Sequence, residues 1–122
     1  MTTTTLNLKF KGTDYQVPFT SNQPNAPIQE IQENCQCELD NFPNSMLSLG
    51  IYPTSITHIV HSSGYHTWIH TFALKDSIES FNLGPILKGK LIKYYSDPEV
   101  YSEEAQIITT NNSLTIVTQA SI

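Results

Sequence analysis

Apolar and polar residues alternate along several short stretches of this chain, and that period of two predicts β-strands. The first two stretches, residues 6–10 and 15–19, are joined by residues 11–14, which contain a glycine. Two such runs around a short glycine-containing connection predict a hairpin. Pro18 has no backbone N–H group, so we expect its strand to lie at a sheet edge or to end there.

All four histidines and the only tryptophan fall within one further hairpin pattern. Ser63 and Gly64 fit a two-residue turn at its centre. With that turn, His61 lies opposite His66 on the neighbouring strand. Alternation then gathers a set of rings on one face of the hairpin and places His58 on the other face. The shared face holds His61, His66, Trp68, His70 and Phe72.

One stretch has helical rather than strand periodicity. Its apolar residues recur at intervals of three and four, as one face of a helix requires. They are Ile28, Ile31, Cys35 and Leu39. Pro27 suits the first turn of a helix, so we expect a helix over about residues 27–39.

The remaining pattern is weaker. Residues 76–79 resemble a capping box for one or two helical turns, and residues 86–95 read as a strand. Residues 105–118 form a last hairpin pattern around Asn111 and Asn112, a pair that tolerates the positive φ angles of a tight turn.

Three hairpins and one helix predict a single α+β domain over residues 1–122. We expect a twisted antiparallel sheet of five to seven strands, with the helix of residues 27–39 across one face. Residues 1–5 are polar and are expected as a frayed tail. The alternative is a small all-β barrel or sandwich, which requires residues 28–39 to be extended.

Composition narrows the class of protein. The chain has a net charge of −5, and its six basic residues are all lysines. Arginine supplies the forked contacts to phosphates and base edges, so its absence disfavours a nucleic-acid partner. No apolar stretch approaches the ~20 residues of a membrane span, and the first residues lack a secretion signal. With two cysteines only, we expect a cytoplasmic protein without membrane insertion.

The histidines and cysteines raise the question of a metal site. Cys35, Cys37, His61 and His66 are the ligand types of a zinc centre. Their spacing does not support it, because two helical residues separated by one position point ~200° apart around the axis. We therefore expect no cofactor, and a zinc-type domain or a metal-dependent enzyme on the histidine hairpin is the alternative.

Catalytic motifs are missing from the chain. It has no glycine-rich phosphate loop, no Gly-x-Ser-x-Gly and no His-Glu-x-x-His. The sequence leaves the enzyme question open and favours a non-catalytic protein.

Aromatic residues at turns and strand ends indicate a protein interface instead, because exposed aromatic side chains concentrate binding energy. The candidate contact residues are Tyr65, His66, His70, Tyr94 and Tyr95. We expect a small binding or regulatory module, an adaptor or an inhibitor, with a protein partner or a second copy of itself.

Residues 8–15 read Leu-Lys-Phe-Lys-Gly-Thr-Asp-Tyr. This segment resembles the Leu-x-Tyr/Phe-Arg/Lys-Gly-x-x-Tyr opening of a short cyanobacterial domain of unknown function, in which arginine is common where Lys11 stands. The resemblance implies a cyanobacterial source and an accessory role around photosynthetic or regulatory assemblies. It implies no activity.

Overall fold

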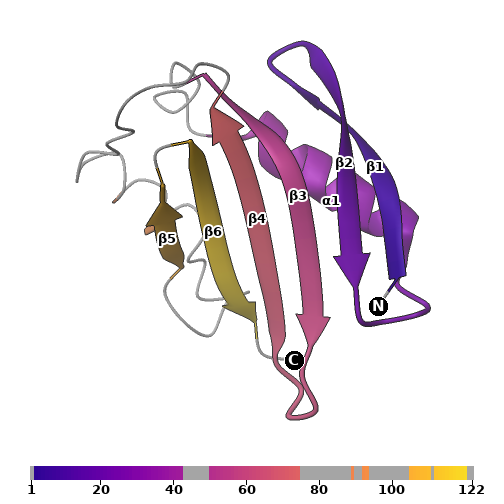
Figure 1. The fold of residues 1–122 in the computed structure, drawn as a ribbon. Coiled ribbons are helices and arrows are strands. Elements are labelled where there is room, and N and C mark those ends of the chain that lie inside the picture. Colours follow the sequence, from indigo (N-terminus) through magenta and orange to yellow (C-terminus); the bar gives the residue numbers. More distant parts are fainter. Residues whose placement is uncertain are drawn as a thin grey trace.

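The computed structural model describes residues 2–42, 50–74, 89, 92–93, 105–110 and 112–120. These residues form a six-stranded sheet and a helix packed against it (Figure 1). The elements in chain order are β1 (Thr2–Phe10), β2 (Thr13–Ser21), α1 (Ile28–Asp40), β3 (Ile51–Val60), β4 (His66–Leu74), β5 (Gln106–Thr109) and β6 (Ser113–Ala120). The predicted α+β class is confirmed, and so is the predicted helix within about one residue at each end.

The strand order is β1-β2-β3-β4-β6-β5. All neighbours are antiparallel except β2 and β3, which run parallel. Helix α1 connects these two strands, as a parallel pair requires a crossover. The sheet is therefore mixed, and the prediction of a wholly antiparallel sheet is wrong at this pair. With β1 and β5 at opposite ends of the order, the sheet does not close into a barrel.

The β1–β2 hairpin is longer than the sequence pattern predicts. Lys11 and Gly12 form its turn with φ of 54° and 78°, the two positive values of a type I′ turn. Pairing continues to Thr2 opposite Ser21, so the residues expected as a frayed tail belong to β1 from Thr2 onward. Strand β2 is interior rather than at an edge, but its pairing with β3 starts only after Pro18.

The β3–β4 hairpin has a three-residue loop where we expected a two-residue turn. The His61 amide donates to the Tyr65 carbonyl at 2.8 Å, and Gly64 closes the loop with a φ of 96°. His66 consequently pairs with Val60, and the predicted pairing of His61 with His66 is wrong. A shift of one residue in the pairing register moves each side chain of the strand to the other face of the sheet.

The core lies between α1 and one face of the sheet. From the helix it takes Ile31, Cys35 and Leu39; from the strands it takes Leu6, Leu8, Phe10, Val17, Phe19, Ile51, Ile56, Phe72, Leu114 and Ile116; Phe42 and Ala105 complete it. Side chains of the helix also bind the outer strand β1. Gln32 accepts from the Asn7 amide at 3.0 Å, and Gln36 bonds both the amide and the carbonyl of Lys9 at 2.8 Å. These bonds hold α1 over the β1 side of the sheet.

The helical turns expected over residues 76–83 fall outside the described residues. Of the strand expected over residues 86–95, the structure describes Gly89, Ile92 and Lys93, which are helical, so the prediction of a strand is wrong at these residues. The C-terminal hairpin is confirmed, with β5 antiparallel to β6. Among the helices that the structure describes, none has both the length and the apolar character to cross a membrane.

Candidate binding site

A cleft of about 470 Å³ lies between α1 and the sheet, on the side of the helix away from β1. We call it the histidine cleft. Its helix wall consists of Pro27, Glu30, Ile31, Asn34, Cys35 and Glu38, and its sheet wall consists of His58, His66, Trp68 and His70. The two walls bring together residues 20 or more positions apart in the sequence.

The helix wall follows from helical geometry. Glu30, Asn34 and Glu38 recur every four residues, so they lie on one side of α1. Each stands one position before a buried residue of the helix, which puts it at the border between core and cleft. The glutamines that bind β1 lie on the opposite border, so holding the helix over β1 leaves β3 and β4 open to the cleft.

The sheet wall is a row of four nearly parallel rings. His58 stacks on Trp68 with a centroid distance of 4.1 Å and on His66 with one of 4.9 Å. Trp68 and His70 are 6.3 Å apart, and the interplanar angles along the row are 16° to 20°. The observed register places these four rings on the helix side. The prediction that His58 lies on the other face is therefore wrong.

A hydrogen bond of 2.7 Å joins His58 Nε2 to His66 Nδ1. Of these two nitrogens, one must donate the proton and the other must accept it. They therefore cannot both carry a proton while the bond is formed. The second nitrogen of His58, Nδ1, is buried and has no hydrogen-bond partner. A buried polar atom without a partner costs about 1–3 kcal/mol, so the free protein carries an unsatisfied site here.

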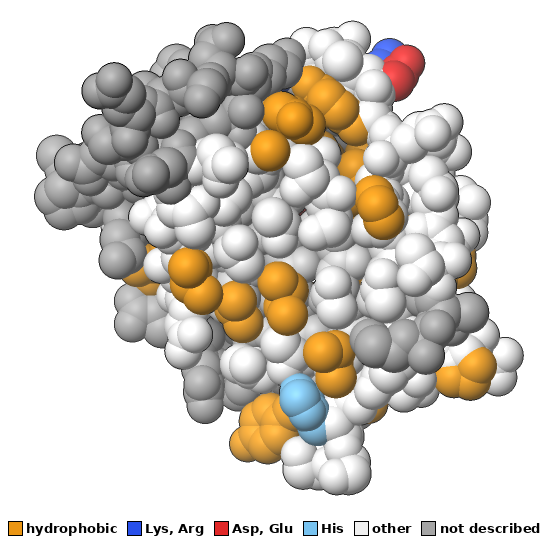
Figure 2. All heavy atoms as spheres, in the orientation of Figure 1, with side chains coloured by type: hydrophobic (Ala, Val, Ile, Leu, Met, Phe, Trp, Pro, Cys, Tyr) orange, Lys and Arg blue, Asp and Glu red, His pale blue; other side chains and the backbone are white. Residues whose placement is uncertain are grey.

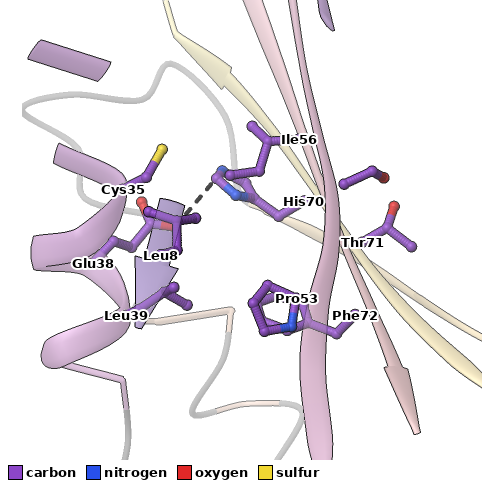
Figure 3. Close-up of a pocket in the computed structure, with 10 residues that line it drawn as sticks. Leu8, Cys35, Glu38, Leu39, Pro53, Ile56, His70, Thr71 and Phe72 are labelled. Carbon is purple, nitrogen blue, oxygen red and sulfur yellow. Dashed lines mark ion pairs between the residues drawn. The ribbon is translucent and has the colours of Figure 1, made fainter. Parts of the chain in front are cut away.

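Burial keeps the deeper histidines neutral. It lowers the pKa of His58, and the neighbouring His66 lowers it further. Burial also lowers the pKa of His70, although the Glu38 carboxylate acts in the opposite direction. Figure 3 shows Glu38 and His70 pointing toward each other from helix and strand; His70 Nε2 and Glu38 Oε1 are 3.7 Å apart.

The two cysteines have different environments. Burial, followed by the Glu38 charge, raises the pKa of Cys35 to about 12, so its thiol is protonated at neutral pH and a poor nucleophile. Cys37 is exposed, and its sulfur lies 3.5 Å from the Asn41 amide nitrogen.

The four predicted metal ligands do not converge. Cys35 and His66 line the histidine cleft, Cys37 points away from it, and His61 is on the other face of the sheet. Within the described part of the chain, no group of three or more His, Cys, Asp or Glu residues is placed to hold a metal ion.

The predicted contact residues are separated as well. Tyr65 is 44% exposed at the loop of the β3–β4 hairpin. His66 and His70 point to the helix side, and His70 is buried, so they do not extend a surface around Tyr65. Tyr94 and Tyr95 lie outside the described residues. Tyr65 instead shares a shallow depression with His61 and Gln119.

The face of the sheet opposite α1 is a second candidate. We call it the open face, and Figure 2 shows it almost without charged side chains. By strand alternation it contains Thr3, Thr5, Thr20, Thr57, Ile59, Thr67, Ile69, Thr71, Thr115, Val117 and Gln119, with Ile108 on the outer strand β5. In the described part of the chain its charged residues are Lys9 and Asp14, which pair across β1 and β2.

Sequence reasoning missed the open face and the acidic wall of the cleft. The signal for the open face was the alternating threonines, which we used only to identify strands. Glu30 and Glu38 carried no separate signal, because glutamates beside a buried helical stripe usually face solvent.

Comparison of the chain with protein-family models, curated proteins and solved structures gives no match. The resemblance of residues 8–15 to a cyanobacterial domain therefore stays a prediction. Any function must be argued from the geometry of the cleft and of the open face.

Proposed function

We propose that this chain is a non-catalytic binding module that acts through a protein interface, and that the open face is that interface. The observation that supports the proposal is the scarcity of charged side chains on the described part of this face, where only Lys9 and Asp14 carry charge, in a protein of net charge −5. Interface centres are depleted in charged residues, whereas an ordinary solvated sheet face is rich in them.

The chemistry of the face suits a second copy of the same chain. Two molecules with a charge of −5 repel each other, and that repulsion is smallest where both present an uncharged surface. The pair Lys9 and Asp14 has no net charge. Two sheets that meet face to face pack about 10 Å apart through such β-branched side chains.

The size of the face is also sufficient. Strands β2, β3, β4 and β6 have eight to ten residues each. At strand spacings of about 4.8 Å and about 3.3 Å per residue, β3, β4 and β6 form a face of about 15 Å by 30 Å, to which β2 adds the three residues that pair with β3, Phe19–Ser21. A stable complex covers about 800 Å² of each partner, so this face with its rim supplies most of what is needed.

Tyr65 at the rim supports the proposal. The loop that carries it is held by a chain of hydrogen bonds: Thr67 Oγ1 donates to Gln119 at 2.8 Å and lies 2.7 Å from His61 Nε2. Because the single hydroxyl proton of Thr67 goes to Gln119, His61 is the donor to Thr67. A partly exposed aromatic residue on a braced loop is a suitable anchor for a partner.

The test is a charge placed at the middle of the open face. Ile69 lies opposite Thr57 on one side and Val117 on the other. We expect the wild-type chain to self-associate in sedimentation equilibrium and Ile69→Lys to be monomeric. Gln29→Lys adds the same charge on the exposed surface of α1 and should leave association unchanged. A wild-type chain that stays monomeric at every concentration contradicts the second copy as partner.

A further inference from the structure

We infer that the outer edge of β1 binds an extended peptide segment of another protein as an additional strand of the sheet. β1 is the last strand on its side of the sheet order, and no strand of the described chain lies beyond it (Figure 1). The inference uses main-chain groups at the rim of the sheet, so it does not depend on the proposed association through the open face.

The register of the β1–β2 hairpin determines which main-chain groups of β1 point outward. Its two-residue turn makes Phe10 and Thr13 a hydrogen-bonded pair, so the N–H and C=O groups of the even-numbered residues of β1 point to β2. Those of the odd-numbered residues point away from β2. The Asn7 and Lys9 amides agree with this alternation, because they donate to side chains of α1 instead of to β2.

Helix α1 covers only the second half of this edge. Gln36 binds the amide and the carbonyl of Lys9, and one helical turn earlier Gln32 binds the Asn7 amide. The two elements stay in step, because four helical residues advance by about 6 Å and two strand residues by about 6.6 Å. The preceding position in this helical series is Ile28. Its side chain has no hydrogen-bonding group, so the next outward residue of β1 stays uncovered.

The uncovered part of the edge has unpaired main-chain groups. In the described part of the chain, the outward N–H and C=O groups of Thr3 and Thr5 have no hydrogen-bond partner, and both residues are exposed. Proteins usually protect such an edge with charged residues, prolines, bulges or a covering element. The stretch Thr2–Leu6 has no charge and no proline, and its pairing with β2 is in unbroken register. The protection of the edge therefore stops where the glutamine series ends.

These groups select the kind of partner. An extended main chain presents donors and acceptors at alternate residues about 6.6 Å apart, so it can pair with Thr3 and Thr5 at once. The partner residue between those two pairs lies opposite Thr4 and places its side chain toward α1, beside Ile28, which is 36% exposed. The partner is therefore a short extended segment with an apolar residue at this central position.

The test uses the synthetic peptide acetyl-Thr-Val-Thr-Val-Thr-amide in two forms. In the first form only the valine nitrogens are methylated, so the threonine N–H groups can still pair with β1 while a valine side chain faces α1. In the second form every amide nitrogen is methylated, which removes the donors that pairing requires. NMR measures the hydrogen exchange of individual amides of the full chain as each peptide is added.

In the free chain we expect fast exchange at Thr3 and Thr5 and slow exchange at Thr4, whose amide points to β2. The first peptide should slow exchange at Thr3 and Thr5 in a saturable manner, and the fully methylated peptide should not. No saturable protection, or equal protection by both peptides, overturns the proposal. Protection that exists without peptide and disappears on dilution identifies a second copy of the chain as the occupant, which also overturns it.

Matched helix variants locate the site. Ile28→Gln continues the glutamine series at an exposed position, so we expect its side chain to cover Thr5 and to weaken binding of the first peptide about 3- to 10-fold, as the loss of one hydrogen bond does. Glu30→Gln places the same side chain on the cleft border of the helix and should leave binding unchanged. Gln32→Ala uncovers the Asn7 amide, which the peptide should then protect as well. Wild-type binding by Ile28→Gln overturns the placement of the peptide at this edge.

Discussion

The two faces of one strand, β4, differ in nearly every chemical property. Toward α1 it presents His66, Trp68, His70 and Phe72, and toward the open face it presents Thr67, Ile69, Thr71 and Ala73. Three residues of the first set, His66, Trp68 and His70, form the sheet wall of the histidine cleft together with His58 of β3, opposite the carboxylates of Glu30 and Glu38. The second set is uncharged and contains no titratable group.

This difference shows how a single strand can present two different chemistries on the two faces of a sheet. Along β4 the titratable side chains, His66 and His70, point to the helix side, and the side chains on the open face are threonine, isoleucine and alanine. Changes on the helix side should therefore affect stability and its pH dependence, while changes on the open face should affect the proposed association.

The largest expected effect is the loss of a core ring on the helix side. Phe72 is 2% exposed and packs against Phe10 and Phe42, so we expect Phe72→Ala to lower the free energy of unfolding by about 3–5 kcal/mol. Ile69→Ala on the open face of the same strand should cost about 1 kcal/mol, because Ile69 is already partly exposed. Urea denaturation measures both. Equal losses would contradict the asymmetry of the two faces.

The next effect is a loss of stability in acid. The pKa values of His58 and His70 are lowered from 6.5 in the folded chain, so the unfolded chain binds more protons below that pH. Stability should be highest above pH 6.5 and fall as the pH drops below it, by about 1.4 kcal/mol for each unit of pKa depression. The two histidines in contact are His58 and His66, which lie diagonally across β3 and β4 and share a hydrogen bond, not His61 and His66.

Two variants localise that acid response. His58→Phe keeps a ring in the stack and removes the titrating group, so its unfolding free energy should depend less on pH. His61→Gln changes a histidine on the other face and should keep the wild-type dependence. Thermal melts between pH 5 and pH 8 make the comparison. If the stability of His58→Phe depends on pH as that of the wild type does, then His58 is not the group that causes the loss of stability in acid.

A smaller effect tests the loop that determines which residues reach which face. Gly64 has a φ of 96°, a conformation that side-chain-bearing residues adopt at a cost of about 1–2 kcal/mol. We expect Gly64→Ala to lower the free energy of unfolding by that amount and Ser63→Ala to be nearly neutral. A neutral Gly64→Ala would mean that the loop does not depend on a left-handed residue.

The smallest expected effect is that of metal removal. Because the four candidate ligands Cys35, Cys37, His61 and His66 lie in three different places, we expect less than one zinc per chain by elemental analysis of untagged protein. Chelation should leave Tm unchanged. A structural zinc contributes folding free energy directly, so a large fall in Tm with chelator would overturn this expectation.

Local patterns in the sequence were enough to predict the elements. The spacing of Ile31, Cys35 and Leu39 identified α1 because an amphipathic helix must bury one stripe of its surface. Alternation identified the strands of all three hairpins for the same reason. The charge and the absence of arginine were also read from the sequence alone.

Only the tertiary structure decided which side chains of these elements lie next to one another. The hydrogen bonds of His61 with Gly64 and Tyr65 close a three-residue loop instead of a two-residue turn. The register of the hairpin shifts with the loop length, so that His58 lies on the helix side of the sheet and His61 does not. The parallel pairing of β2 with β3, and the bonds of Gln32 and Gln36 to β1, decide where α1 lies. The histidine cleft exists because these contacts join segments far apart in the chain, and no local periodicity encodes such a distance.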